Sequence, residues 1–238
     1  MKECSFELIE NAPLTIDVHR LTLRGDTSAI TRPGQFVNVR IDELFLRRPL
    51  AVCDVDGDRL TLLCRTAGKG TETLCSMNNG KLNLLTGLGN GFDPTLAGNA
   101  PLLVAGGIGL APLYFLCKEL DNARVILGFN TADEVMYMDE FITLGIPVTV
   151  ATADGSYGVK GFPTDVMRNM RYSHLYVCGP EAMLKAVHAV AETDGQYSFE
   201  ARMGCGFGAC MGCTCRTITG NKRICREGPV LKGSELLW

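Results

Sequence analysis

The last forty or so residues hold a group of cysteines whose spacing suits a metal centre. Cys205, Cys210 and Cys213 follow the pattern C-x4-C-x2-C, and Cys225 comes after eleven further residues. Four thiolates spaced in this way can wrap a [2Fe–2S] cluster. The loop between the first two ligands must curl tightly, and glycines give its backbone that freedom. Four of them lie in the segment: Gly204, Gly206, Gly208 and Gly212.

Structural zinc on the same four thiolates is the competing interpretation. Zinc knuckles usually use two C-x2-C pairs, whereas this segment has one, and its ligand order is that of plant-type ferredoxins. The spacing therefore favours [2Fe–2S]. A fifth cysteine, Cys215, would form an awkward C-x-C pair with Cys213, so we expect it not to be a ligand.

A second candidate site is the glycine turn in LLVAGGIGLAPLYFL. Gly107-x-Gly109-x-x-Pro112, preceded by Gly106, follows an apolar run and precedes a helical pattern. Such a turn lets a pyrophosphate approach backbone amides at the N-terminus of a helix. A tight strand–helix turn can also be purely structural.

The acid that usually binds the ribose, about twenty residues after such a turn, is not evident. Asp133 and Glu134 come later, and no arginine stands there to receive a 2′-phosphate. The sequence therefore favours NAD over NADP.

Cys178-Gly179-Pro180 directly follows the apolar run LYV and precedes a helical pattern. Open α/β sheets bind ligands at the carboxyl ends of their strands. We take Cys178 as the candidate catalytic residue, with Gly179 and Pro180 beside the nucleotide. The alternative is a turn that contains a buried cysteine.

Two arginines, Arg47 and Arg48, precede the apolar segment Pro49-Leu50-Ala51. Burying them is costly unless an anion such as a pyrophosphate pairs with them. Farther on, Gly68-Lys69-Gly70-Thr71 forms a glycine turn at the start of a short helical segment, which also suits phosphate. A solvent-exposed basic edge would explain the arginines equally well.

These candidate residues lie in three segments. Residues 5 to 92 contain five or six short runs rich in β-branched residues, which predict a small antiparallel barrel. From 101 to 196, apolar runs alternate with helical patterns, which predicts a parallel sheet with helices on both faces. We expect domains at 1–95, 96–198 and 199–238, with the linker between the first two at 93–100.

Composition narrows the possible functions. The chain of 238 residues has a net charge of −3, so no basic excess points to nucleic acid or an anionic membrane. Residues 101–117 carry no charge, but glycines and a proline make a buried strand, turn and helix a better interpretation than a membrane span. The start of the chain does not resemble a signal peptide, and we expect a cytoplasmic protein.

The motifs RRPLAV, GKGT, GLGNGF, AGGIGLAP and CGP, in this order, resemble the ferredoxin-NADP reductase superfamily. The ending MGCGFGACMGCTC…CREGP is similar to the electron-transfer subunits of class 1B dihydroorotate dehydrogenases. The resemblance spans essentially the whole chain. It implies an FAD-binding β-barrel domain, a Rossmann-like NAD-binding domain with a parallel sheet, and a small C-terminal [2Fe–2S] segment.

The resemblance also implies roles for individual residues. Arg48, Pro49, Leu50 and Ala51 would lie along FAD. Its other main contacts would be Leu63, Cys64, Arg65, Gly70 and Thr71. The cluster would be held by Cys205, Cys210, Cys213 and Cys225. Ala51 departs from the family, which often has serine or threonine there, so a hydroxyl close to the flavin is missing or replaced by backbone.

The same resemblance implies a partner. Electrons from dihydroorotate would pass from the FMN of a catalytic subunit to this cluster, then to FAD and NAD, within a heterotetramer of two copies of each subunit. The chain has no evident site of its own for oxidising an organic substrate. Alternatives are a subunit of a ferredoxin:NADP oxidoreductase or sulfide dehydrogenase complex, and a zinc-stabilised nucleotide-binding regulator.

Overall fold

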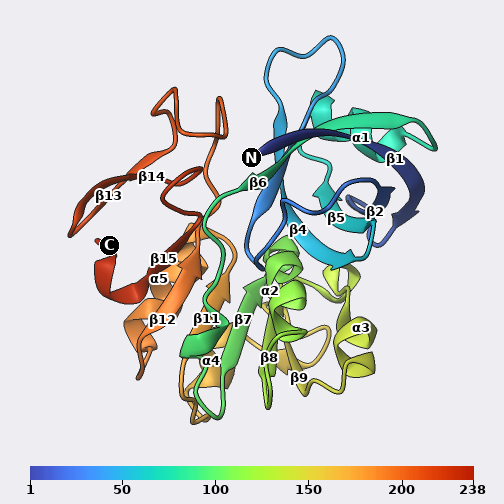
Figure 1. Cartoon of the computed structure of the whole chain (residues 1–238). Helices are drawn as coiled ribbons and strands as arrows, with labels where there is room; N and C mark the ends of the chain where they lie inside the picture. The colour runs from blue at the N-terminus through green and yellow to red at the C-terminus, as the bar shows by residue number, and fades with distance from the viewer.

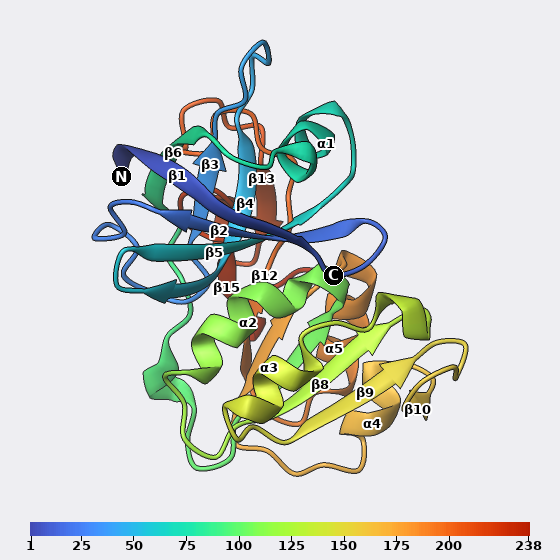
Figure 2. The same ribbon diagram turned by 90° about the vertical axis from the view of Figure 1, so that its right-hand side faces the viewer.

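The computed structural model describes residues 1–238 and consists of a barrel, a sheet covered by helices, and a C-terminal tail beside both. The barrel lies above the sheet in Figures 1 and 2, and Figure 1 shows the tail at the side of both. The expected fold class is confirmed: an antiparallel barrel is followed by a parallel sheet of the Rossmann-like kind.

Six strands close the barrel in the order β1-β2-β5-β4-β3-β6. Alternate residues of these strands face inward, as in Phe6 and Leu8 of β1, and form one core of aliphatic and aromatic side chains. The helix α1 (Lys69–Ser76) follows β5 and begins at the predicted glycine turn. The strands are β1 (Lys2–Pro13), β2 (Val18–Arg24), β3 (Phe36–Val39), β4 (Arg48–Asp56), β5 (Arg59–Arg65) and β6 (Lys81–Leu88).

The second half is a seven-stranded sheet in the order β10-β9-β8-β7-β11-β12-β15. All neighbours are parallel except β12 and β15. Its central strands are buried on both faces, which explains their continuous apolar runs. The strands are β7 (Leu102–Gly106), β8 (Arg124–Phe129), β9 (Val148–Thr152), β10 (Val159–Lys160), β11 (Leu175–Cys178), β12 (Gly195–Ser198) and β15 (Val230–Lys232).

Helices cover both faces of this sheet, as predicted. Leu103 and Ala105 of β7 pack with residues of α2 (Leu110–Cys117) and α3 (Met138–Thr143). Leu102 and Val104, which point to the opposite face, pack with residues of α4 (Pro163–Met167) and α5 (Glu181–Val190). Four single-turn 3-10 helices complete the structure: η1 (Pro94–Leu96), η2 (Gly107–Gly109), η3 (Ala132–Glu134) and η4 (Gly233–Glu235).

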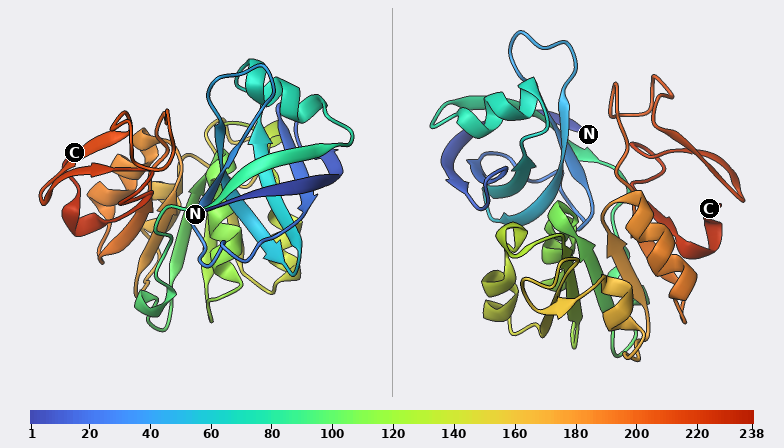
Figure 3. Two further views of the ribbon diagram at one scale, coloured as in Figure 1. Left: turned by 45° about the horizontal axis from the view of Figure 1, so that its top comes forward. Right: turned by 180° about the vertical axis from the view of Figure 1, so that it is seen from behind.

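The cysteine-rich tail folds against both halves. Its hairpin, β13 (Thr214–Thr217) and β14 (Gly220–Arg223), stands apart from the main sheet, and the chain then returns through β15 to pair with β12. The side chain of Asn90, just after the barrel, donates to the carbonyl of Val230 at 2.7 Å. Figure 3 shows the tail alongside the barrel and the sheet.

Helix α2 lies between barrel and sheet and contacts β4. Lys118, just past its end, forms an ion pair with Asp54 of β4 at 2.7 Å. Arg20 of β2 and Glu140 of α3 form a second pair at 3.7 Å. The junction of the two halves is therefore joined by helix packing and by two ion pairs.

The uncharged segment 101–117 forms β7, η2 and α2, as predicted. None of the helices combines the length and apolar character needed to cross a bilayer.

Candidate functional site: two adjoining cavities and a cysteine loop

A cavity of about 370 Å³ opens between the barrel and the sheet. On the barrel side its wall is formed by Pro49, Leu50, Ala51 and Leu63, which the sequence had linked to FAD. Cys64 does not face it, because its side chain is fully buried in the barrel core. Only the backbone of Cys64 can therefore serve a ligand here.

Arg48 lies next to the glycine turn at the start of α1. A Cβ atom added to Gly70 would stand 2.4 Å from Arg48 Nε, so the absence of a side chain at Gly70 admits the guanidinium. Thr71 lines the cavity, and its hydroxyl accepts from the amide of Ala67 at 2.8 Å. The structure thus places the Arg48 guanidinium against a turn whose Thr71 reaches the cavity, although Arg48 and Gly70 do not line the cavity themselves.

Arg47 is engaged elsewhere. Its guanidinium pairs with Glu3 at 2.8 Å and donates to the carbonyl of Asn83 at 3.2 Å. The two adjacent arginines therefore differ: Arg47 ties barrel strands together, while Arg48 faces the turn.

The sheet forms the opposite wall of this cavity. Cys178 and Ser198, at the ends of the neighbouring strands β11 and β12, both line it. Burial raises the pKa of the Cys178 thiol well above its ordinary value, so the thiol is neutral. Pro112 of the glycine motif lines this cavity and not the neighbouring one, which places it on the barrel side of the glycine turn.

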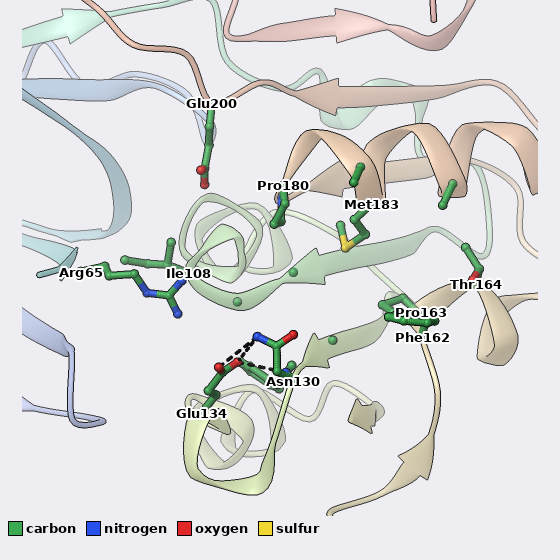
Figure 4. Close-up of a pocket in the computed structure, with 16 residues that line it drawn as sticks. Arg65, Ile108, Asn130, Glu134, Phe162, Pro163, Thr164, Pro180, Met183 and Glu200 are labelled. Atoms are coloured by element: carbon green, nitrogen blue, oxygen red, sulfur yellow. Dashed lines mark hydrogen bonds between the residues drawn. The ribbon is translucent and has the colours of Figure 1, made fainter. Parts of the chain in front are cut away.

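A second cavity of about 510 Å³ adjoins the first along the carboxyl ends of the sheet strands. Gly106, Gly107 and Pro180 contribute to its wall (Figure 4). Gly107 has a φ of +54° and only the Arg65 guanidinium within 4 Å of an added Cβ, so its backbone lies open to a ligand.

Other glycines of the motif serve packing. A Cβ atom on Gly109 would stand 2.5 Å from the carbonyl oxygen of Cys178, and one on Gly179 would stand 3.0 Å from the amide nitrogen of Gly106. Neither Gly109 nor Gly179 lines the cavity. Gly109 and Gly179 therefore serve packing, whereas Gly106 and Gly107 are the glycines that remain candidates for ligand binding.

Three residues line both cavities: Arg65, Ile108 and Glu200. Arg65 pairs with Asp17 at 3.2 Å and lies beside the Gly107 turn (Figure 4). Desolvation within the cleft raises the pKa of Glu200, and the nearby charge of Arg65 acts in the opposite direction. A ligand in one cavity therefore meets a ligand in the other beside an acid and a guanidinium.

Glu134, one of the two acids that follow the glycine turn at a longer spacing than usual, is the one that reaches the larger cavity. It lines the larger cavity and accepts hydrogen bonds at 3.0 Å from the backbone amide and side chain of Asn130, just after β8 (Figure 4). A carboxylate at the end of this strand suits a ribose hydroxyl. Its neighbour Asp133 is exposed and does not line the cavity.

The four expected cluster cysteines lie in one loop region as two pairs. The amide of Cys210 donates to the Cys205 sulfur at 3.4 Å, and the amide of Cys225 donates to the Cys213 sulfur at 3.4 Å. No three of these thiols converge closely enough to hold a single ion. Two pairs fit a two-iron cluster, which takes two thiolates on each iron, better than zinc, which needs all four on one ion.

The backbone of this loop favours negative charge on sulfur, as the glycine content predicted. Desolvation raises the pKa of Cys205, but hydrogen bonds from the amides of Cys210, Phe207 and Ala209 outweigh it and bring the value to about 6. Cys215 lies instead in β13 opposite Lys222, and no hydrogen bond joins its sulfur to the other four.

The cysteine loop and the smaller cavity share a wall. Phe36 lines the cavity and belongs to the same buried cluster as Cys213 and Cys225. Met203 also lines the cavity and packs against that cluster. The two cavities and the cysteine loop thus form one continuous series.

Comparison with known proteins agrees with this arrangement. Residues 200–237 match the family model of the iron-sulfur cluster binding domain of dihydroorotate dehydrogenase B. A protein of Geobacillus sp. (strain WCH70), named "Dihydroorotate dehydrogenase B (NAD(+)), electron transfer subunit", is 40% identical over 256 residues, covering 100% of this chain and 99% of its own. This chain belongs to that family of electron transfer subunits. A Fusobacterium nucleatum protein of the same name is 40% identical over 258 residues, covering 99% and 98% of the two chains.

Solved structures agree in fold. The structure of an NADH-dependent reduced ferredoxin-NADP oxidoreductase superposes with a TM-score of 0.88 at 29% identity, covering 98% of this chain and 90% of that one. A ferredoxin NADP+ reductase of Neisseria gonorrhoeae, solved with bound FAD and NADP, superposes with a TM-score of 0.68 at 16% identity, covering 80% of this chain and 90% of that one. The resemblance read from the motifs is confirmed. The chain is an electron-transfer subunit of the flavin oxidoreductase type, with FAD, [2Fe–2S] and NAD as its cofactors.

Proposed function

We propose that this chain is the electron-transfer subunit of an NAD-linked dihydroorotate dehydrogenase. Residues 1–95 bind FAD, 96–198 bind NAD(H), and 199–238 hold a [2Fe–2S] cluster. The observation that carries the proposal is the continuity of the three sites. The larger cavity shares Arg65 and Glu200 with the smaller one, and the smaller one shares Phe36 with the cysteine loop.

Each part of the chain has a defined task in this proposal. Pro49, Leu50, Ala51 and Leu63 hold the flavin ring on the barrel, while Arg48 and the turn of Gly70 and Thr71 hold its pyrophosphate. FAD, when bound, can exchange electrons in pairs or singly, which joins a nicotinamide to a cluster.

On the other side, Gly106, Gly107 and Pro180 receive the dinucleotide. Gly109 and Gly179 keep strand ends close enough for that turn to form. Cys178 closes the sheet side of the smaller cavity, where the flavin would lie. Its neutral thiol supplies a polarisable surface without a charge.

Ser198 offers a replacement for the hydroxyl missing at Ala51. Both residues line the smaller cavity, one from the sheet and one from the barrel. The Ser198 hydroxyl lies near the sulfur of Cys178 and counteracts the rise in the pKa of that thiol. A bound flavin would therefore meet a serine from the opposite wall.

The partner we propose is an FMN-containing catalytic subunit that oxidises dihydroorotate in the cytoplasm, with two copies of each subunit in the complex. Two observations support a protein partner at the cysteine loop. Cys210 is exposed, and so are the neighbouring apolar side chains Phe207 and Met211. The curated relatives are named as subunits.

Reconstitution tests the proposal. This chain, loaded with FAD and cluster, should give NAD-dependent dihydroorotate oxidation only when a matching FMN subunit is added. The structural relative at 29% identity supports one alternative, a ferredoxin-linked NAD(P)H oxidoreductase complex. Electron transfer between reduced ferredoxin and NADP, with no response to dihydroorotate and the FMN subunit, would favour that alternative.

A further inference from the structure

Asn38 joins the barrel directly to the cysteine loop. It lies in β3, where Val37 and Val39 point into the barrel core and Asn38 therefore points outward. Its side chain is 1% exposed. The amide Nδ2 donates to the main-chain carbonyl of Cys205 at 3.0 Å. A buried asparagine thus meets the backbone of a cluster-ligand candidate.

The loop is shaped around this side chain. Gly206 has a φ of +75°, and a Cβ atom built there would stand 1.9 Å from Asn38 Nδ2. A residue with a side chain at this position would displace either the asparagine or the loop. The glycine next to Cys205 is thus required by contact as well as by backbone conformation.

The main chain of Asn38 is held by contacts of its own. Arg47, held by Glu3, also donates to the main-chain carbonyl of Asn38 at 3.4 Å. Across the sheet, Asn38 pairs in register with Pro49, which lines the smaller cavity. Asn38 therefore connects the flavin-site strand β4 to Cys205. Its main chain pairs with β4, and its side-chain amide bonds to Cys205.

We propose that Asn38 is a positioning residue that fixes the Cys205–Cys210 half of the cluster relative to the flavin cavity. Its amide dipole, with the N–H end toward Cys205, also favours extra negative charge there and so stabilises the reduced cluster. The inference rests on the proposed [2Fe–2S] cluster. The Oδ1 atom of Asn38 is buried and has no hydrogen-bond partner, which is unfavourable. The proposed role accounts for this cost, because only an amide side chain can make the Nδ2 contact with Cys205.

The first test compares Asn38→Ala with Asn83→Ala in the full chain carrying FAD and cluster. Asn83 lies on the adjacent strand β6, and its side chain makes no hydrogen bond. In Asn38→Ala we expect a more negative midpoint potential of the cluster and broadened or shifted electron paramagnetic resonance of its reduced form. Loss of one neutral hydrogen bond predicts iron retention roughly two- to tenfold lower under chelator challenge. Asn83→Ala should match the wild type in potential and spectrum.

The second test is a double-mutant cycle. Gly206→Ala should lose most of the cluster, because of the clash with Asn38 and the positive φ of Gly206, and Asn38→Ala in the same chain should restore only the part that is due to the clash. Wild-type potential and spectrum in Asn38→Ala would overturn the inference alone, as would full cluster retention in Gly206→Ala. A wild-type chain that takes up no iron or sulfide would overturn the proposed function, and this inference with it.

Discussion

Phe36 of the barrel and Cys225 of the tail pack in the same buried cluster, although they come from opposite ends of the chain. Phe36 also lines the cavity assigned to the flavin. This shared cluster therefore places a cluster-ligand candidate in the apolar packing that borders the cavity. Such packing keeps water out of the space that electrons must cross.

The cysteine assignment predicts distinct results for five serine variants. Changing Cys205, Cys210, Cys213 or Cys225 should remove most of the bound iron and sulfide, because each pair of thiols then lacks a member. Cys215→Ser should retain both, since Cys215 lies in β13 outside the two pairs. Iron and sulfide assays check this. Loss of cluster in Cys215→Ser, together with an intact cluster in Cys213→Ser, would reverse the assignment.

Arg48→Ala should weaken FAD binding about ten- to a hundredfold, because a charge-assisted hydrogen bond contributes about 1.5–3 kcal/mol. Arg47→Ala should weaken FAD binding less and lower the melting temperature instead, since Arg47 holds Glu3 and Asn83. Flavin fluorescence during dialysis, with thermal unfolding measured in parallel, separates the two effects. Equal flavin retention in both variants would contradict a pyrophosphate contact at Arg48.

Glu134→Gln should raise the KM for NADH roughly ten- to a hundredfold if the carboxylate binds a ribose hydroxyl. It should also reduce the preference for NADH over NADPH, because the repulsion of a 2′-phosphate is lost. The matched control is Asp133→Asn, whose exposed side chain lies outside the cavity. Steady-state kinetics with a dye acceptor measure the KM for NADH and the preference for NADH over NADPH. Unchanged preference in Glu134→Gln would place the ribose elsewhere.

The two glycines of the turn should respond differently to alanine. Gly109→Ala forces a Cβ atom onto the Cys178 carbonyl, and such overpacking costs about 1–3 kcal/mol, so the melting temperature should fall by several degrees. Gly107→Ala has open space but a positive φ, which costs about 1 kcal/mol, and its main effect should be weaker binding of NADH. Calorimetry and NADH titration distinguish them. The reverse pattern would show that Gly109 faces the ligand.

The sequence predicted the barrel, the parallel sheet and the position of the glycine turn because each depends on local patterns. Short β-branched runs predicted β1 to β5, and uninterrupted apolar runs predicted β7, β8, β9 and β11. The helices proved shorter than the apolar pattern suggested, and α2 ends at Cys117. Strand β12 was missed, because GQYS is too short and polar to show a period.

The residues that local patterns did not reveal act through tertiary contacts. Phe36, Asn38, Ser198 and Glu200 belong to no motif, and only the packing of barrel, sheet and tail brings them to the cavities or the loop. Glu134 was visible but came later than the usual spacing, because it is the last residue of η3 and does not directly follow β8. At Cys64, strand alternation turns the side chain into the barrel core, which leaves only its backbone for the expected FAD contact.

The most direct test is to assay the purified, cofactor-loaded chain with dihydroorotate, first alone and then with the FMN subunit. Alone, it should oxidise NADH with a dye acceptor and leave dihydroorotate unchanged. With the subunit, NAD-dependent formation of orotate should appear, and Cys210→Ser should abolish it while leaving much of the NADH–dye activity, since dyes can take electrons from FAD. Orotate formed by the chain alone, or coupled activity that survives complete loss of the cluster, would contradict the proposed route.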